Sequence, residues 1–295
     1  MIVSQPNLEA LRTGFNTAFK SGLKSAASKY TLLATTVSSS TKVETYGFLG
    51  DFPKFRKWVG EKRIRSMKEQ AYQLVNDSFE NTVGIHKDQI RDDNLGLYGP
   101  MAEGWGKTAG KLADQLVFDA LKNGHQRLCY DGQNFFDAEH PLADTNTTWS
   151  NINTAGAVQP WFLLDCSQGL KPILYQERQA PTFDMVTDPT DSHVFKTGEF
   201  LMGGEARGAA GYTYPQLAYR STATLNEAGY KAAREVMTTL KDDNGDPLGI
   251  KPTHLVVGSS NAAAARALIK AQTLANGAAN IWFNDVEVVE VEWLA

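Results

Sequence analysis

The segment over residues 43–78 constrains the fold of this chain most, because it is rich in aromatic residues and yet too short to have a core of its own. Its middle part combines three glycines, a proline and a basic cluster with five large aromatic side chains, namely Tyr46, Phe48, Phe52, Phe55 and Trp58. So few residues cannot bury enough apolar surface to fold alone. A long aromatic excursion is typical of a surface that contacts another surface. We therefore expect an extended loop that docks onto a second molecule.

Charge is distributed unevenly along the 295 residues, whose net charge is −4. Residues 1–70 carry 12 basic and 5 acidic side chains, a net charge of +7, so the remaining residues carry −11. The last eleven residues contain four acidic side chains and no basic one. Oppositely charged ends favour head-to-tail self-association, because complementary patches guide encounter and register. The alternative is that these charged faces are simply solvated.

Composition excludes several classes of protein. The chain is 42% hydrophobic and 21% charged, and its length suffices for one large domain or two modest ones. Two cysteines, Cys129 and Cys166, make neither a disulfide framework nor a CxxC zinc pair, so a reducing compartment is expected. The first residues lack the apolar region of a signal peptide, and no apolar run reaches the ~18 residues of a membrane span. We therefore expect neither secretion nor membrane insertion.

Two stretches have helical periodicity. The first, over residues 5–30, repeats apolar side chains every three or four residues. The longest, over residues 95–123, is expected to start at Asp93 or Asn94 and to end at Gly124. Its first half contains five glycines, each of which weakens a helix: Gly96, Gly99, Gly104, Gly106 and Gly110. We expect a helix that tolerates so many glycines to lie close against another backbone.

Alternating apolar residues predict strands in the middle of the chain. Residues 71–90 predict two strands, and residues 161–220 predict a β-rich block of short runs between turns. The polar stretch 35–45 has nothing to build a core and is interpreted as an extended arm or linker. The glycine-rich run 202–211 lacks the lysine of a phosphate-binding loop, so we interpret it as a bulged strand.

The pattern changes near residue 222 to helix, strand, helix, strand, which predicts a domain boundary there. Thr224 and Glu227 form a capping box that is expected to open the first of these helices. Residues 253–258 predict a buried strand, and a helix is expected from Ser259 or Ser260 to about Leu274. A closing strand is predicted over 286–294.

The densest polar motif, CYDGQNFFDAEHP over residues 129–141, offers the only candidate chemistry. Its polar side chains are Cys129, Asp131, Asp137, Glu139 and His140. A cysteine nucleophile needs a base beside it and a third group that orients the base. Asp137 and His140 also have the spacing of metal ligands on one helical turn, although a third ligand is not evident. The alternative, which we prefer, is structural: a tight turn at Asp131–Gly132 followed by aromatic anchors.

Five distinctive sequence blocks are spread over most of the chain: TYGFLGDFPKFRKWVGEKRI, SFENTVGIHKDQIRDDNLGLYGP, CYDGQNFFDAEHP, WFLLDCSQGLKPILYQER and GIKPTHLVVG. Together they resemble the Mu-like prophage major head subunit (gpT) family. The resemblance implies an α+β protein with the Hong Kong ninety-seven type phage capsid fold. It divides the chain into an N-terminal arm (1–42), an extended β-hairpin loop (43–78), a peripheral domain (79–222) with spine helix 95–123, and an axial domain (223–295).

The same resemblance implies a major capsid protein that self-assembles into hexamers and pentamers of an icosahedral shell around double-stranded DNA. It implies residence in the virion, and in the host cytoplasm during assembly. A scaffold protein, a portal and non-specifically bound DNA are the implied partners, with no membrane, cofactor, metal ligand or catalytic residue. The connectivity of the axial part is expected to differ from more usual members of the fold, because the β-rich block precedes it.

The charge split and the aromatic segment together predict which residues contact a neighbouring subunit. The expected contact residues are Phe52, Lys54, Phe55, Arg56, Lys57, Trp58, Lys62, Arg63 and Arg65. Two alternatives from other classes stay open at this point. One is a cysteine- or metal-dependent hydrolase that uses the 129–141 motif, and the other is a nucleic-acid-binding module that uses residues 51–70.

Overall fold

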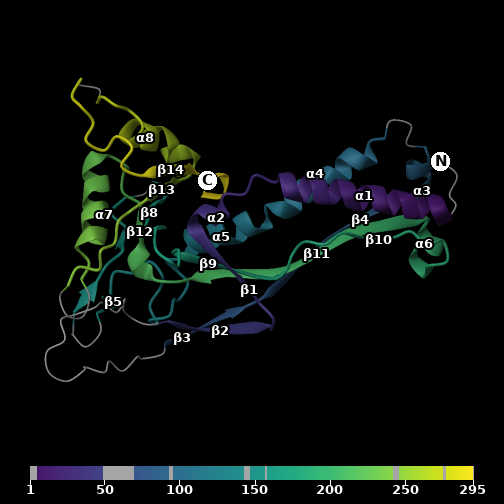
Figure 1. The fold of residues 1–295 in the computed structure, drawn as a ribbon, viewed down its shortest axis with the longest axis horizontal. Coiled ribbons are helices and arrows are strands. Elements are labelled where there is room, and N and C mark those ends of the chain that lie inside the picture. Colours follow the sequence, from purple (N-terminus) through teal and green to yellow (C-terminus); the bar gives the residue numbers. More distant parts are fainter. Residues whose placement is uncertain are drawn as a thin grey trace.

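The structure, a computed structural model, describes residues 5–48, 70–92, 96–142, 147–156, 158–241, 246–274 and 277–294. The molecule is elongated, with long helices above one sheet and a second sheet among shorter helices at the other end (Figure 1). Within the described ranges, none of the helices is long and apolar enough to cross a membrane.

The helices in chain order are α1 (Gln5–Ser25), α2 (Tyr30–Leu33), α3 (Lys87–Arg91), α4 (Tyr98–Gly110), α5 (Leu112–Asn123), α6 (Ser192–Thr197), α7 (Glu227–Thr239) and α8 (Ser259–Ile269), with 3₁₀ turns at Pro215–Leu217 and Glu292–Leu294. The strands are β1 (Ala34–Ser38), β2 (Val43–Phe48), β3 (Gln70–Val75), β4 (Asp77–His86), β5 (His140–Pro141), β6 (Thr148–Trp149), β7 (Ile152–Asn153), β8 (Trp161–Leu164), β9 (Ile173–Gln179), β10 (Asp184–Val186), β11 (Glu199–Tyr212), β12 (Ala218–Ser221), β13 (His254–Val257) and β14 (Glu287–Glu290).

Helices α1 and α4 lie side by side with their backbones almost in contact (Figure 1). A Cβ atom on Gly106 of α4 would overlap the carbonyl oxygen of Phe19 of α1. A Cβ atom on Gly22 of α1 would likewise overlap the carbonyl oxygen of Glu103. The close backbone approach predicted for the glycine-bearing helix is therefore confirmed, and the apolar face of α1 is buried against α4 and the first sheet.

The single helix predicted over 95–123 is wrong, because the chain forms two helices, α4 and α5. Lys111 separates them with a ψ of −2°, far from the helical value of about −42°. The expected start at Asp93 or Asn94 lies outside the described residues. The end at Gly124 is confirmed as a position but not as a left-handed cap, since Gly124 has a φ of −60°.

The first sheet has the strand order β1-β9-β11-β10, with β4 also paired to β11. Its polar first strand, β1, pairs in parallel with β9, so the stretch 35–45 begins as part of the sheet rather than as a free linker. The two strands predicted over 71–90 are confirmed as β3 and β4. The bulge predicted for 202–211 is also confirmed, because the register of β11 against β9 shifts between Arg207 and Gly208.

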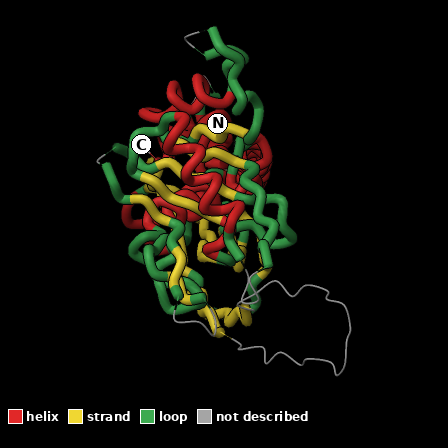
Figure 2. The backbone as a smooth tube through the Cα atoms, turned by 90° about the vertical axis from the view of Figure 1, so that its left-hand side faces the viewer, coloured by secondary structure: helices red, strands yellow, loops and turns green. Residues whose placement is uncertain are grey.

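The hairpin β2–β3 lies on the side of the first sheet that faces away from α1 and α4, at the lower edge of both views (Figures 1 and 2). Its two strands are antiparallel, with Val43 opposite Val75. The hydroxyl of Tyr46 donates to Gln176 Oε1 of β9 at 2.6 Å. The Gln176 amide in turn donates to Asn76 Oδ1 at 2.8 Å. These buried bonds attach the base of the hairpin to the sheet.

The second sheet has the order β14-β13-β8-β12-β7, and all four residues of the central strand β8 have no exposed surface. Trp161 and Leu163 face a core shared with α7 and α8, whereas Phe162 and Leu164 face a core shared with α5. The sheet joins strands from both sides of residue 222, because β8 pairs with β13.

Several predicted boundaries near this sheet need correction. The helix–strand–helix–strand order after residue 224 is confirmed, but α7 is capped by Asn226, whose side chain accepts from Gly229 N at 2.9 Å, and not by Thr224. Helix α8 ends at Ile269, five residues before the predicted end. Within the predicted β-rich block, residues 192–197 form α6, because Asp191 accepts hydrogen bonds from the first backbone amides.

Candidate functional site

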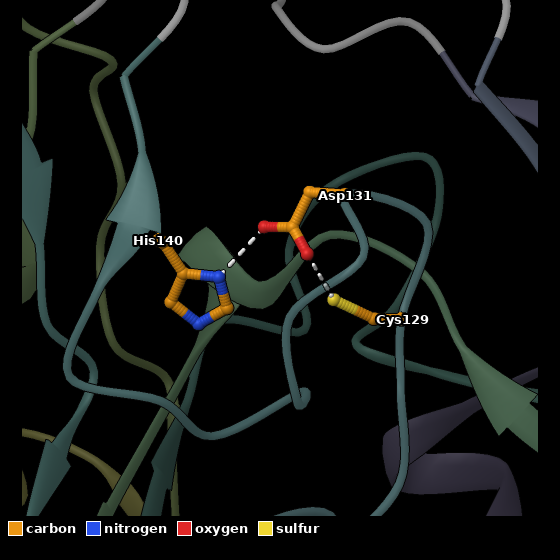
Figure 3. A group of neighbouring side chains, drawn as sticks. All are labelled: Cys129, Asp131 and His140. Atoms are coloured by element: carbon orange, nitrogen blue, oxygen red, sulfur yellow. Dashed lines mark hydrogen bonds and ion pairs between the residues drawn. The ribbon is translucent and has the colours of Figure 1, made fainter. Parts of the chain in front are cut away.

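Three side chains of the polar motif 129–141 form one compact cluster, in which Asp131 lies between Cys129 and His140 (Figure 3). The Cys129 thiol donates to Asp131 Oδ1, with 3.0 Å between sulfur and oxygen. His140 Nδ1 lies 2.7 Å from Asp131 Oδ2, and the backbone amide of Gln133 also donates to Asp131 Oδ1 at 3.0 Å. The carboxylate is thus the common acceptor of the cluster, which the turn at Gly132, with its φ of +83°, brings together.

The other side of the His140 ring is equally well satisfied. The ring is fully buried and stacks on Trp149, with 4.5 Å between centroids. Its Nε2 atom lies 3.2 Å from Asn151 Oδ1. The Asn151 amide donates to the carbonyl oxygens of Phe135 and Pro215 at 2.8 and 3.1 Å. The cluster therefore ties the loop after α5 to β6, to β7 and to the turn before β12.

The electrostatics of the cluster disfavour a reactive thiolate. Burial by itself would raise the pKa of Asp131, but the hydrogen bonds from His140 and Cys129 lower it overall. The Cys129 thiol is 5% exposed, and burial, followed by the negative charge of Asp131, raises its pKa well above the usual range. Because the thiolate is the nucleophile, a buried thiol that donates to a carboxylate is poorly suited to covalent catalysis.

Among the described residues, Cys129, Asp131 and His140 are also the one group of side chains whose ligand atoms could together reach a metal ion, all lying within 4.8 Å of one another. Two of these three atoms are already held at hydrogen-bond distance by the third residue's carboxylate. Asp131 thus engages both Cys129 and His140, so the arrangement is best explained as a buried hydrogen-bond network that fixes the loop.

The nine contact residues predicted from the sequence, from Phe52 to Arg65, all lie outside the described residues. The structure places only the hairpin that leads into and out of that segment, β2 and β3. The set of contact residues therefore stays a prediction.

Two buried polar residues were missed by the sequence reasoning. Asn151 joins the cluster from a region whose sequence has no clear periodicity. Its neighbours in the sequence do not indicate that it is buried. Asp114 of α5 accepts from the backbone amides of Lys29 and Tyr30 at 2.9 and 2.7 Å, which attaches the segment after α1 to α5. A signal existed for Asp114, because it lies three residues before the buried Val117 and so on the apolar face of the helix.

Comparison with known proteins identifies the family. The family model described as "Mu-like prophage major head subunit gpT" matches residues 8–294. The major capsid protein of Escherichia phage Mu is 40% identical over 285 residues, which cover 94% of this chain and 93% of that protein. The Mu-like prophage FluMu major head subunit of Haemophilus influenzae is 41% identical over 272 residues, which cover 89% and 88%. The chain belongs to the Mu-like gpT family.

Solved structures agree with this assignment over the full length of the gpT-family subunit. A chain of the procapsid of bacteriophage JBD30 superposes with a TM-score of 0.87 and 41% identity, covering 99% of this chain and all of the other. A chain of the JBD30 capsid gives 0.81 and 32%, with complete coverage of both. The mixed helix and strand content is thus that of a phage capsid protein, and this gpT-family subunit is a major capsid protein of a tailed phage.

This assignment and the cluster geometry lead to the same conclusion about residues 129–141. The hydrolase alternative has no support, since the thiol of Cys129 bonds to the carboxylate of Asp131 and the relatives are capsid proteins. In this gpT-family subunit, the cluster fixes the loop after α5 next to the second sheet.

Proposed function

We propose that this subunit self-assembles into hexamers and pentamers that close an icosahedral shell around double-stranded DNA. The full-length match to the JBD30 procapsid chain, with a TM-score of 0.87, is the observation that carries the proposal. Repeated heterologous contacts close into rings when the rotation closes, and ring-to-ring contacts then close a shell. We assign the fold to the Hong Kong ninety-seven type, which the arrangement of hairpin, helices and two sheets supports.

The domain division follows as part of the same proposal. Residues 1–42 are the arm, 43–78 the extended loop, 79–222 the peripheral domain and 223–295 the axial domain. The pairing of β8 with β13 argues that the axial unit also takes in β7, β8 and β12. The apolar face of α1 is occupied by α4 of the same chain, so α1 offers a neighbour only its polar face.

The segment between β2 and β3 is proposed to bind a neighbouring subunit. Its aromatic residues would fill apolar depressions, and its basic residues would meet acidic surface. The sequence supports this, because seven basic side chains lie within 51–70 while residues 71–295 carry a net charge of −11. The hydrogen bonds of Tyr46 and Gln176 hold the base of the hairpin, so the segment is presented from a fixed platform.

The remaining partners are proposed on the same basis. A scaffold protein and a portal take part during assembly in the host cytoplasm. In the finished virion, the subunit is part of the capsid shell. DNA inside the shell would be contacted without sequence specificity, through phosphate groups.

Electron microscopy and sedimentation of the expressed subunit test the proposal. Rings, tubes or closed shells that appear above a threshold concentration are the expected result, with monomers below it. A chain that stays monomeric at every concentration and salt condition, and in the presence of the phage's other head proteins, contradicts it.

A further inference from the structure

Arg220 carries a charge on the apolar face of the second sheet. It lies in β12, and only 7% of its surface is exposed. The register places it opposite Phe162 of β8 and Ile152 of β7, so the three side chains leave the sheet on the same face. Phe162 belongs to the core beneath α5, and Ile152 packs against that core. The stem and the Nε atom of Arg220 are therefore buried among apolar neighbours.

This guanidinium has no acidic partner among the residues that the structure describes. Its Nε atom is buried and makes no hydrogen bond. Burial lowers the pKa of Arg220. The group that responds to its charge is His125, whose pKa is lowered first by burial and then by Arg220. A histidine is no counter-ion for an arginine, so none of the residues that the structure describes neutralises the charge of Arg220.

Arg234 shows how the same chain treats an arginine that it does pair. The Nε and Nη2 atoms of Arg234 donate to the two carboxylate oxygens of Asp285 at 2.8 and 3.1 Å. Tyr230 donates to the same carboxylate at 2.6 Å. Arg220 is more buried than Arg234, yet it has no such hydrogen bonds among the described residues. Because a buried charge without a partner is costly, a partner for Arg220 is expected outside the single chain.

We propose that Arg220 is a recessed binding site for a carboxylate side chain of a neighbouring copy of this subunit. The inference rests on the proposed function, since the carboxylate arrives only on assembly. Carboxylates are abundant on the partner, whose residues 71–295 carry a net charge of −11. The planar guanidinium suits a carboxylate, and its recessed position admits a flexible Asp or Glu side chain more readily than the broad phosphate backbone of DNA.

Two arginine-to-methionine variants of the full chain test the site, because methionine keeps the unbranched length and removes the charge. In Arg220→Met, unassembled subunits should unfold at a urea midpoint equal to or above that of the wild type, since an unpaired charge is removed. The subunit concentration needed for shell formation, followed by light scattering and sedimentation, should rise at least about ten-fold. Arg234→Met is the matched control, and its midpoint should fall, because Asp285 loses its partner.

Other outcomes overturn the inference. If the urea midpoint of Arg220→Met falls as that of Arg234→Met does, or if the variant fails to fold, the guanidinium of Arg220 stabilises the isolated subunit. If Arg220→Met forms shells at the same subunit concentration as the wild type, Arg220 does not bind a carboxylate of a neighbouring subunit. Sulfate at constant ionic strength that raises the melting temperature of unassembled wild type, but not of Arg220→Met, identifies a free anion as the occupant instead.

A conservative variant and the wild type complete the test. Arg220→Lys keeps the charge without the planar fork and should assemble at an intermediate concentration, whereas assembly as poor as that of Arg220→Met contradicts charge pairing. A wild type that never forms shells contradicts the proposed function and this site together. A wild type and an Arg220→Met variant that assemble equally well contradict the site alone.

Discussion

The cluster around Asp131 and the segment between β2 and β3 use polar side chains in opposite ways. Every polar side chain in the cluster bonds within the chain: Cys129 and His140 to Asp131, and His140 also to Asn151. The segment instead concentrates basic and aromatic residues that have no core of their own. The cluster shows that a motif dense in chemically reactive residues can be purely structural, whereas the basic and aromatic segment is proposed to serve assembly.

The largest effect is expected when the buried imidazole ring of the cluster is removed. His140→Ala deletes a fully buried ring with two hydrogen-bond contacts and a stacking partner, Trp149. The free energy of unfolding of the unassembled subunit should fall by about 3–5 kcal/mol, because a cavity forms and the Asp131 carboxylate loses its partner. Urea denaturation measures this. A loss below about 1 kcal/mol would show that the cluster is not an integral part of the fold.

Asp131→Asn should cost somewhat less, about 2–4 kcal/mol near neutral pH, because an amide cannot accept from all three donors. The folded-state pKa of Asp131 is lowered, so its contribution is present above the unfolded pKa of about 3.9 and is lost as pH falls through the lower folded value. The difference between wild type and variant should therefore shrink in acid. Denaturation at pH 7, 5 and 3 measures this difference in stability. A difference that does not change with pH contradicts the lowered pKa of Asp131 in the folded state.

Cys129→Ala should lower the free energy of unfolding by only about 1 kcal/mol at pH 7. One hydrogen bond to a charged acceptor is lost, and the apolar replacement offsets part of that loss. Burial raises the folded pKa of this thiol, so the unfolded state alone ionises above about pH 8.5 and the wild type loses stability there. The cost of the variant should shrink between pH 8 and 10, under reducing conditions. Shell formation should be unaffected, and a variant that folds but cannot assemble would place Cys129 in an interface.

The smallest effect on subunit stability is expected in the β2–β3 segment. Combined reversal of Arg56, Lys57 and Arg63 to glutamate should change the free energy of unfolding by less than about 0.5 kcal/mol, yet abolish shell formation. The control reverses three exposed lysines elsewhere, Lys20, Lys196 and Lys231, and so changes net charge equally. Loss of shells in both variants would trace the effect to net charge, and normal shells from the first would contradict the proposed contact.

Periodic features of the fold could be predicted from the sequence. The apolar repeat of α1 and the glycines of α4 led to a helix packed closely against another backbone, and Gly106 and Phe19 now show that contact. The alternation in 71–90 led to β3 and β4, in which Leu74 and Ile85 are buried. These predictions succeeded because each depends on side chains a few residues apart, which a helix or strand brings to one face.

Features that depend on distant residues could not be predicted. The break at Lys111 follows Gly110, but α4 continues through Gly104 and Gly106, so the glycines by themselves do not locate it. Nothing near Asn151 indicates that its amide bonds to Phe135 and Pro215. For the candidate site, the sequence supplied the three residue types but not their order in space, and that order decides whether a thiol faces a base or a carboxylate.

The sequence by itself determined the family, the order of most helices and strands, and the separation of a basic, aromatic segment from the acidic remainder. Those properties depend on local patterns and on matched sequence blocks, so they can be recognised without a three-dimensional structure. Only the tertiary structure decided that Asp131 separates Cys129 from His140, and that Arg220 is buried with no acid beside it in the described part of the chain. Burial and pairing depend on which distant strands meet, and no spacing along one chain encodes that directly.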